Sequence, residues 1–129
     1  IVMARAEAAE RAGLKPRARL LGYAHAGVRP EVMGIGPIPA VQKLLEKIGL
    51  GVDDFDVIES NEAFAAQSLA VLKDLGADQS KVNLDGGAIA LGHPLGATGA
   101  RITGKAAALL KEEGKDYALV TQCIGGGHT

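Results

Sequence analysis

Glycine is concentrated in two stretches of this 129-residue chain, and these stretches restrict how the chain can fold. Residues 86–104 and 125–127 together hold nine of the 18 glycines. Glycine adopts positive φ without strain and lets a backbone come close to another group, so it interrupts helices and strands. Such stretches are typical either of tight turns or of an edge where backbone binds a ligand. The stretches alone leave both possibilities open.

Between the glycines, helical and strand patterns alternate along the chain. Helical patterns cover residues 4–12, 38–48, 61–75 and 97–113, and strand patterns cover residues 18–26, 53–59 and 117–123. The prolines and glycines of residues 28–39 predict a loop, and residues 82–94 are expected to be irregular. The alternation predicts an α/β layered fold, and the length favours a single domain.

Composition argues against several classes of protein. The 14 basic and 15 acidic residues give a net charge of −1, without the basic excess of an electrostatic nucleic-acid binder. No stretch is as long as a membrane span, and no signal peptide is visible. The single cysteine excludes an internal disulfide and a multi-cysteine metal site, and it fits a reducing compartment. We therefore expect a cytoplasmic protein with neither nucleic acid nor membrane as a partner.

His93 lies between a glycine and a proline, just before the helix expected at residues 97–113. The flanking residues hold it in a turn, and a nearby helix N-terminus stabilises negative charge and lowers the pKa of an imidazole. Both effects suit a base or an oxyanion donor. The alternative is a loop histidine without a role.

Two further candidates follow predicted strands. Cys123 ends the strand at 117–123 and is followed by Ile124 and three glycines. Strand ends in α/β folds face the ligand crevice, and successive glycine N–H groups there form an anion nest. The alternative is a small buried residue. Asn61 follows the strand at 53–59, and its amide, or a water it holds, would reach the same crevice unless Ser60 or Asn61 only caps a helix.

Four motifs in this order resemble the C-terminal half of a thiolase, of the acetyl-CoA acetyltransferase or 3-ketoacyl-CoA thiolase kind. They are Val-Met-Gly-Ile-Gly-Pro at 32–37, Asn-Glu-Ala-Phe-Ala-Ala-Gln at 61–67, the Gly-His-Pro segment within 86–101, and Cys-Ile-Gly-Gly-Gly at 123–127. The resemblance covers essentially the whole chain and implies a thiolase-like layered fold, with a mixed sheet flanked by helices. Ketoacyl synthases share that fold and a similar Gly-His segment, but Cys123 and Asn61 favour a thiolase.

The resemblance implies a Claisen condensation, or its thiolytic reverse, on coenzyme A thioesters, with no separate cofactor and no metal. In the family's pattern His93 helps to activate a nucleophilic cysteine and, with a water held by Asn61, forms one oxyanion hole. Cys123 is the acid/base that moves the α-proton, and the backbone N–H of Gly125 contributes to a second oxyanion hole. These roles suit an enolate, because donors fixed before the reaction stabilise an oxyanion best.

The resemblance also implies a substrate channel. Met33, Ala63 and Phe64 match positions that line the pantetheine part of an acyl-CoA. Residues 83–85 depart from the family's pattern, because they read Asn-Leu-Asp where Asn-Pro-Asn is usual.

A larger departure is that the nucleophilic cysteine belongs to the family's N-terminal half, and the only cysteine here already has another role. We therefore expect residues 1–129 to be an incomplete C-terminal domain, truncated at both ends, whose N-terminal half and final strand are absent. It would work with that N-terminal half in a homo-oligomer, and it would be inactive and poorly stable alone. The alternative is a non-catalytic thiolase-fold domain that binds an acyl-CoA or a protein.

Overall fold

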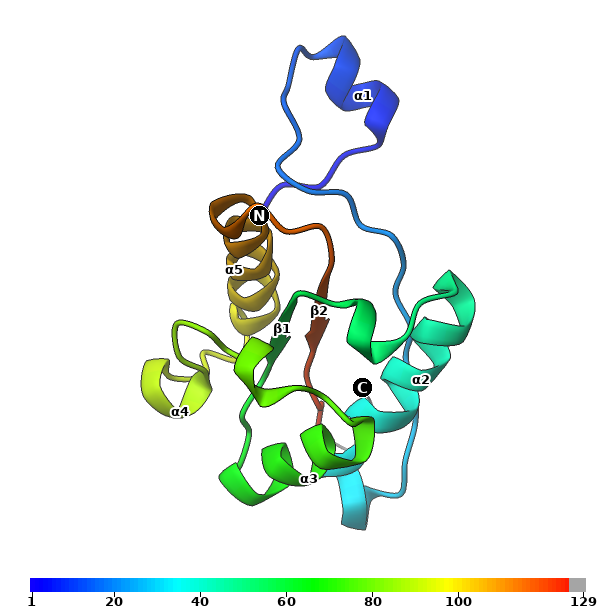
Figure 1. Ribbon diagram of the computed structural model, residues 1–129, viewed down its shortest axis with the longest axis vertical. Helices are drawn as coiled ribbons and strands as arrows, with labels where there is room; N and C mark the ends of the chain where they lie inside the picture. The colour runs from blue at the N-terminus through cyan, green and yellow to red at the C-terminus, as the bar shows by residue number, and fades with distance from the viewer. Residues whose placement is uncertain (126–129) are drawn as a thin grey trace.

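The computed structural model describes residues 1–125, whose helices and strands alternate as Figure 1 shows. Its elements are, in order, α1 (Ala6–Arg11), the 3-10 helix Pro30–Ile35, α2 (Pro37–Ile48), the 3-10 helix Val52–Asp54, β1 (Val57–Ser60), α3 (Ala65–Leu75), the 3-10 helix Gln79–Lys81, α4 (Ala88–Leu91), α5 (Thr98–Glu113) and β2 (Ala118–Thr121). The predicted α/β layered fold is confirmed. The two 3-10 turns at 30–35 and 79–81 and the short α4 lie in or beside segments expected to be irregular.

β1 and β2 form a parallel sheet, in which Val57 lies opposite Ala118 and Ser60 opposite Thr121. Val82 adds a single parallel bridge to Ile58. All four residues of β1 are buried, which is typical of a parallel strand covered on both faces. Both β1–β2 and the bridge at Val82 are parallel, where a mixed sheet was expected.

Helices cover the sheet on two sides, with α5 and α2 on opposite sides of the strands in Figure 1. On the α2 side, Val41, Phe55, Ile58 and Leu119 form a cluster of buried apolar side chains. On the other side α5 contacts both strands and buries a stripe of its own, Ile102, Ala106 and Leu109. The sheet is therefore the middle layer of three.

Glycines end the three longest helices. Gly49, Gly76 and Gly114 have φ of 72°, 67° and 63°, the left-handed conformation that closes a helix and that glycine adopts without strain. The helices predicted at 38–48 and 97–113 are confirmed to within one residue at each end. These ends depend on local sequence, which is why the pattern found them.

The third helix begins later than predicted, at Ala65 rather than at residue 61. The backbone N–H of Asn61 donates to the carbonyl of Thr121 at 2.9 Å, so this residue continues the sheet pairing instead of starting a helix. Phe64 precedes the helix in an extended conformation, with no side-chain cap. The interpretation of Ser60 or Asn61 as a helix cap is therefore wrong.

The strand predicted at residues 18–26 does not form. Within residues 1–125, no backbone hydrogen bond joins this segment to a strand, and a strand needs such a partner to be stable. Two lysines of α2 reach it instead, with the Nζ atoms of Lys43 and Lys47 donating to the carbonyls of His25 and Tyr23. In Figure 1 the segment runs from α1, which stands away from the sheet, down to α2.

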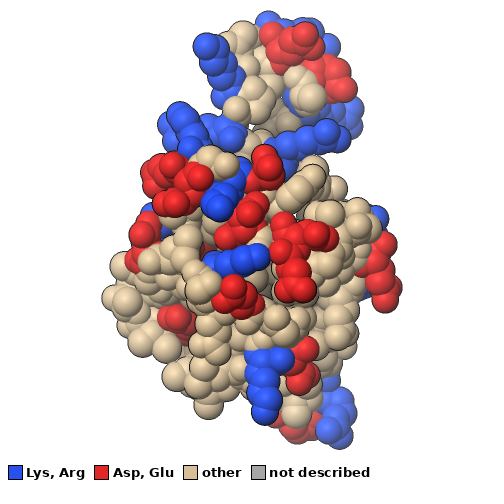
Figure 2. Space-filling view, viewed as in Figure 1, with Lys and Arg blue, Asp and Glu red and all other residues tan. Residues whose placement is uncertain are grey.

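No helix among residues 1–125 is both long enough and apolar enough to cross a membrane. Charges of both signs are interspersed on the face in Figure 2, and the surface over α4 carries few of them.

Candidate functional site

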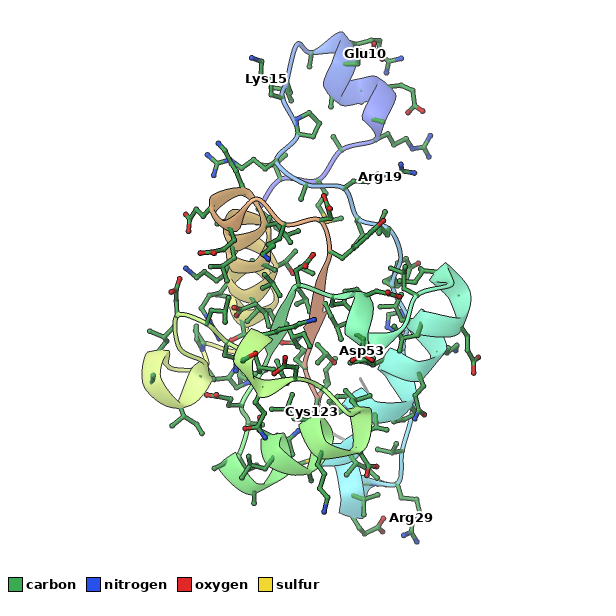
Figure 3. The ribbon with its side chains drawn as sticks, viewed as in Figure 1. Glu10, Lys15, Arg19, Arg29, Asp53 and Cys123 are labelled. Carbon is green, nitrogen blue, oxygen red and sulfur yellow. The ribbon has the colours of Figure 1, made fainter. Side chains whose placement is uncertain are left out.

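The carboxyl ends of the two strands bring two of the predicted site residues to one edge of the sheet. Asn61 follows β1 and is bonded to Thr121, the last residue of β2, and Cys123 lies two residues further along. Figure 3 shows Cys123 beyond the end of β2. The start of α5 is at the same edge, because a Cβ placed on Gly99 would lie 3.7 Å from the side chain of Gln122.

The side chain of Asn61 is buried without a hydrogen-bond partner. The residue is 2% exposed, and neither Nδ2 nor Oδ1 has a partner among the described residues. Leaving a buried polar group unsatisfied costs about 1–3 kcal/mol. An amide kept in this state has both a donor and an acceptor to offer to a water or a ligand.

His93 is anchored to the start of α5. Its Nδ1 lies 2.6 Å from Oγ1 of Thr98, the first residue of that helix. Thr98 is completely buried, and its hydroxyl also donates to the carbonyl of Pro94 at 3.1 Å. His93 itself is exposed, so this contact fixes one edge of a ring whose other edge is open.

A second polar group, which we call the Glu62–Asn83 bracket, joins the end of β1 to the glycine-rich segment. Asn83 bonds both backbone groups of Ser60, at 3.0 and 2.9 Å, and donates to Glu62 Oε1 at 3.1 Å. The other carboxylate oxygen of Glu62 accepts from the N–H of Ile89 at 2.9 Å. The carboxylate occupies the space that a Cβ on Gly87 would need. Close approach, rather than turn geometry, therefore explains this glycine.

Sequence reasoning missed the bracket. Asn83 has a φ of 48°, and asparagine is one of the few non-glycine residues that adopt this conformation readily. An asparagine inside a glycine-rich loop was the one available signal. Asn83 is the first residue of the unusual Asn-Leu-Asp sequence at 83–85 and matches the asparagine of the usual Asn-Pro-Asn. Its side-chain hydrogen bonds therefore stabilise the turn without the proline.

A buried charge lies one position before the end of β1. Glu59 is 1% exposed, and neither carboxylate oxygen has a partner in the described part of the chain. Burial raises the pKa of the Glu59 carboxyl, and the positive charges of Arg101 and Lys105 on α5 oppose that rise. The Nε and Nη2 atoms of Arg101 are also buried and unpartnered. Strand patterning did not anticipate a carboxylate here.

Cys123 is half-buried, and burial raises the pKa of its thiol. The thiol is therefore protonated at neutral pH, as an acid requires. Among residues 1–125, its surroundings move the pKa away from the neutral range expected for a base.

The three predicted channel residues lie on two elements that touch. Ala63 and Phe64 precede α3, with Ala63 half-buried and Phe64 67% exposed, while Met33 lies in the 3-10 helix 30–35 and is 40% exposed. Gln67 of α3 donates to the carbonyl of Gly34 at 2.7 Å, which holds the two elements together.

The last described residue, Gly125, is exposed, and a Cβ placed on it would have no atom of residues 1–125 beyond its chain neighbours within 4 Å. Gly126 and Gly127 lie outside the described residues. Among residues 1–125, no three His, Cys, Asp or Glu side chains are grouped as a metal site would need.

Comparison with known proteins identifies the fold and the family. The model of the thiolase C-terminal domain matches residues 14–129. The beta-ketothiolase BktB of Cupriavidus necator is 62% identical over 127 residues, which are 98% of this chain and 32% of BktB. The beta-ketoadipyl-CoA thiolase of Pseudomonas knackmussii is 58% identical over 129 residues, with the same shares covered.

Solved structures agree. Human mitochondrial 3-ketoacyl-CoA thiolase in complex with CoA superimposes with a TM-score of 0.93 at 49% identity, over 95% of this chain and 31% of that one. The chain belongs to the thiolase family and corresponds to the C-terminal domain of its members. It spans about a third of the length of the curated relatives that it matches.

Proposed function

We propose that this chain is the C-terminal domain of a longer thiolase. That enzyme joins an acyl-CoA and acetyl-CoA by Claisen condensation, or cleaves a 3-ketoacyl-CoA with CoA in the reverse direction. The observation that carries the proposal is the Asn61 amide, buried and unpartnered at the strand edge where Cys123 also lies.

Asn61 and His93 serve an oxyanion hole in this proposal. Asn61 holds a water, which satisfies its amide and presents a proton to the thioester oxygen, while His93 offers a second donor. The burial of Asn61 and the anchoring of His93 to Thr98 support these roles. Donors that are already fixed need no reorganisation when the enolate forms, so they stabilise the transition state most.

Cys123 is the acid/base. Its raised thiol pKa keeps the proton available for a leaving thiolate or for the enolate carbon. In this proposal the backbone N–H of Gly125 contributes to a second oxyanion hole, and Met33, Ala63 and Phe64 line the channel for pantetheine. The contact between α3 and the 3-10 helix of residues 30–35 supports a common channel wall.

The nucleophilic cysteine comes from a partner half of the enzyme, because this chain has a single cysteine. Exposed apolar side chains support the proposal that the partner half covers this face of the domain. Phe64, Ile89 and Leu95 are 67, 65 and 85% exposed. We extend the proposal to a homo-oligomer located in the cytoplasm.

A chimera tests the proposal: the matched region of BktB is replaced by this chain, which is 62% identical to it. We expect the chimera to cleave acetoacetyl-CoA with CoA and the 129-residue chain alone to show no turnover. The chimera carrying Cys123→Ala should lose turnover while still binding CoA, and Cys123→Ser is the matched control for the shape of the side chain.

Two outcomes contradict the proposal. Turnover by the chain alone would show that no second cysteine is needed. A folded chimera that binds CoA without turnover would favour a non-catalytic, acyl-CoA-binding domain.

A further inference from the structure

The hydroxyl of Thr98 is wholly buried and lies beside two groups that differ in their capacity to donate or accept a hydrogen bond. One is the carbonyl oxygen of Pro94 at 3.1 Å, which can only accept a proton. The other is Nδ1 of His93 at 2.6 Å, which accepts or donates according to the tautomer of the ring. With 0% exposure, Thr98 has no solvent to replace either one.

The two neighbours let one hydroxyl match either state of Nδ1. When Nδ1 carries a proton, it donates to Oγ1, and the hydroxyl proton turns to the carbonyl of Pro94. When Nδ1 is bare, the hydroxyl proton turns to it, and the carbonyl of Pro94 keeps the backbone N–H groups of Ala97 and Thr98 as donors at 2.8 and 2.9 Å. No polar group is left unsatisfied in either state.

We propose that Thr98 is the positioning residue of His93, which occupies Nδ1 in each protonation state and leaves Nε2 alone for the reaction. The inference rests on the proposed function, in which His93 acts both as a base and as an oxyanion donor. Those roles need opposite states of Nε2, bare for a base and protonated for a donor. A partner that serves both tautomers permits both roles with the ring held in one place.

The location of Thr98 strengthens the inference. It is the first residue of α5, a helix of 16 residues packed on both strands, so its Oγ1 is held by the body of the fold. His93 lies in the loop between α4 and α5 and is exposed. The hydrogen bond to Thr98 therefore holds the exposed His93 ring in a fixed position against α5.

Three variants of the chimera test this role. Thr98→Val keeps the shape and removes the hydroxyl, Thr98→Ser keeps the hydroxyl, and Thr98→Ala serves if the valine variant does not fold. We expect Thr98→Val to lower kcat by about 10–100-fold, the loss typical when the hydrogen-bond partner of a metal-binding histidine is removed. KM should change by less than about twofold, because Thr98 is wholly buried and offers no surface to a substrate, and Thr98→Ser should restore most of kcat.

A second readout needs no turnover. Diethyl pyrocarbonate acylates free imidazole nitrogens, and peptide mass spectrometry counts the groups on His93. The wild-type and Thr98→Ser chimeras should take up one group, at Nε2, whereas Thr98→Val should accumulate a second at the released Nδ1. This result stands even if the wild-type chimera proves inactive, so failure of the proposed function and failure of this inference are distinguishable.

The inference is overturned if Thr98→Val keeps the wild-type kcat, if Thr98→Ser is as impaired as Thr98→Val, or if all variants show the same acylation of His93.

Discussion

Two neighbouring residues at the end of β1 are treated in opposite ways by the fold. Glu62 has both carboxylate oxygens bonded within the Glu62–Asn83 bracket, whereas the buried side-chain amide of Asn61 has no partner among residues 1–125. The hydrogen bonds of paired groups offset the cost of removing them from water, and they hold segments together. Here Glu62 and Asn83 join the end of β1 to the segment before His93. An unpaired group costs stability and keeps its capacity to bind. The difference separates residues that build the site from residues that act in it.

The largest expected effect comes from the unpaired residue. Asn61→Ala in the chimera should lower kcat by about 10²–10³-fold, the cost of removing one oxyanion-hole donor. The free energy of unfolding, measured in urea, should not fall by more than about 1 kcal/mol, because the side chain has no hydrogen bond to any described group to lose. A variant with a lower free energy of unfolding but the wild-type kcat would show that Asn61 has a structural role, like Glu62 and Asn83.

Substitutions at two glycines test whether the Glu62–Asn83 bracket stabilises the fold. Gly87→Ala places a Cβ against the Glu62 carboxylate and Asn83, and should lower the free energy of unfolding by about 1–3 kcal/mol. Gly96→Ala is the matched control, because no described atom beyond its chain neighbours lies within 4 Å of its Cβ position. We expect a change within about 0.5 kcal/mol for the control, measured by urea unfolding. Equal effects at the two positions would mean that turn geometry, and not the bracket, requires these glycines.

The smallest effect concerns Glu59 of β1, whose buried carboxylate also lacks a partner in the described part of the chain. Since burial raises the pKa of Glu59, the folded chain holds this proton more tightly than the unfolded chain does. Its contribution to stability is complete below the ordinary pKa of 4.5 and is lost as the pH rises through the raised value. Glu59→Gln should therefore reduce the fall in unfolding free energy between pH 4.5 and neutrality. Identical pH profiles for the variant and the wild type would contradict this account.

Sequence alone predicted what local patterns determine. The helices at 38–48 and 97–113 were found because apolar spacing and a closing glycine are properties of each segment by itself. The strand predicted at 18–26 does not form, because a strand depends on a partner elsewhere in the chain. The start of α3 was misplaced because Asn61 bonds to Thr121 and continues the sheet pairing.

The candidate site divides in the same way. Asn61 and Cys123 follow strands, and His93 precedes a helix, so their places along the chain marked them. Glu62 and Asn83 were missed because their hydrogen bonds join segments more than 20 residues apart, which no spacing displays. Thr98 lies only five residues after His93, but its importance depends on how the loop before α5 folds back on the helix. Their roles as hydrogen-bond partners appear only in the folded chain.

The central claim is that this chain supplies the acid/base and oxyanion groups of a thiolase site, while the nucleophile comes from another part of the enzyme. The most direct test is to incubate the chimera and the 129-residue chain with acetyl-CoA and to locate the acetyl group by peptide mass spectrometry. We predict an acetyl group on a cysteine outside this chain, retained in the Cys123→Ala chimera, and none on Cys123. A stable acetyl group on Cys123 would contradict the account.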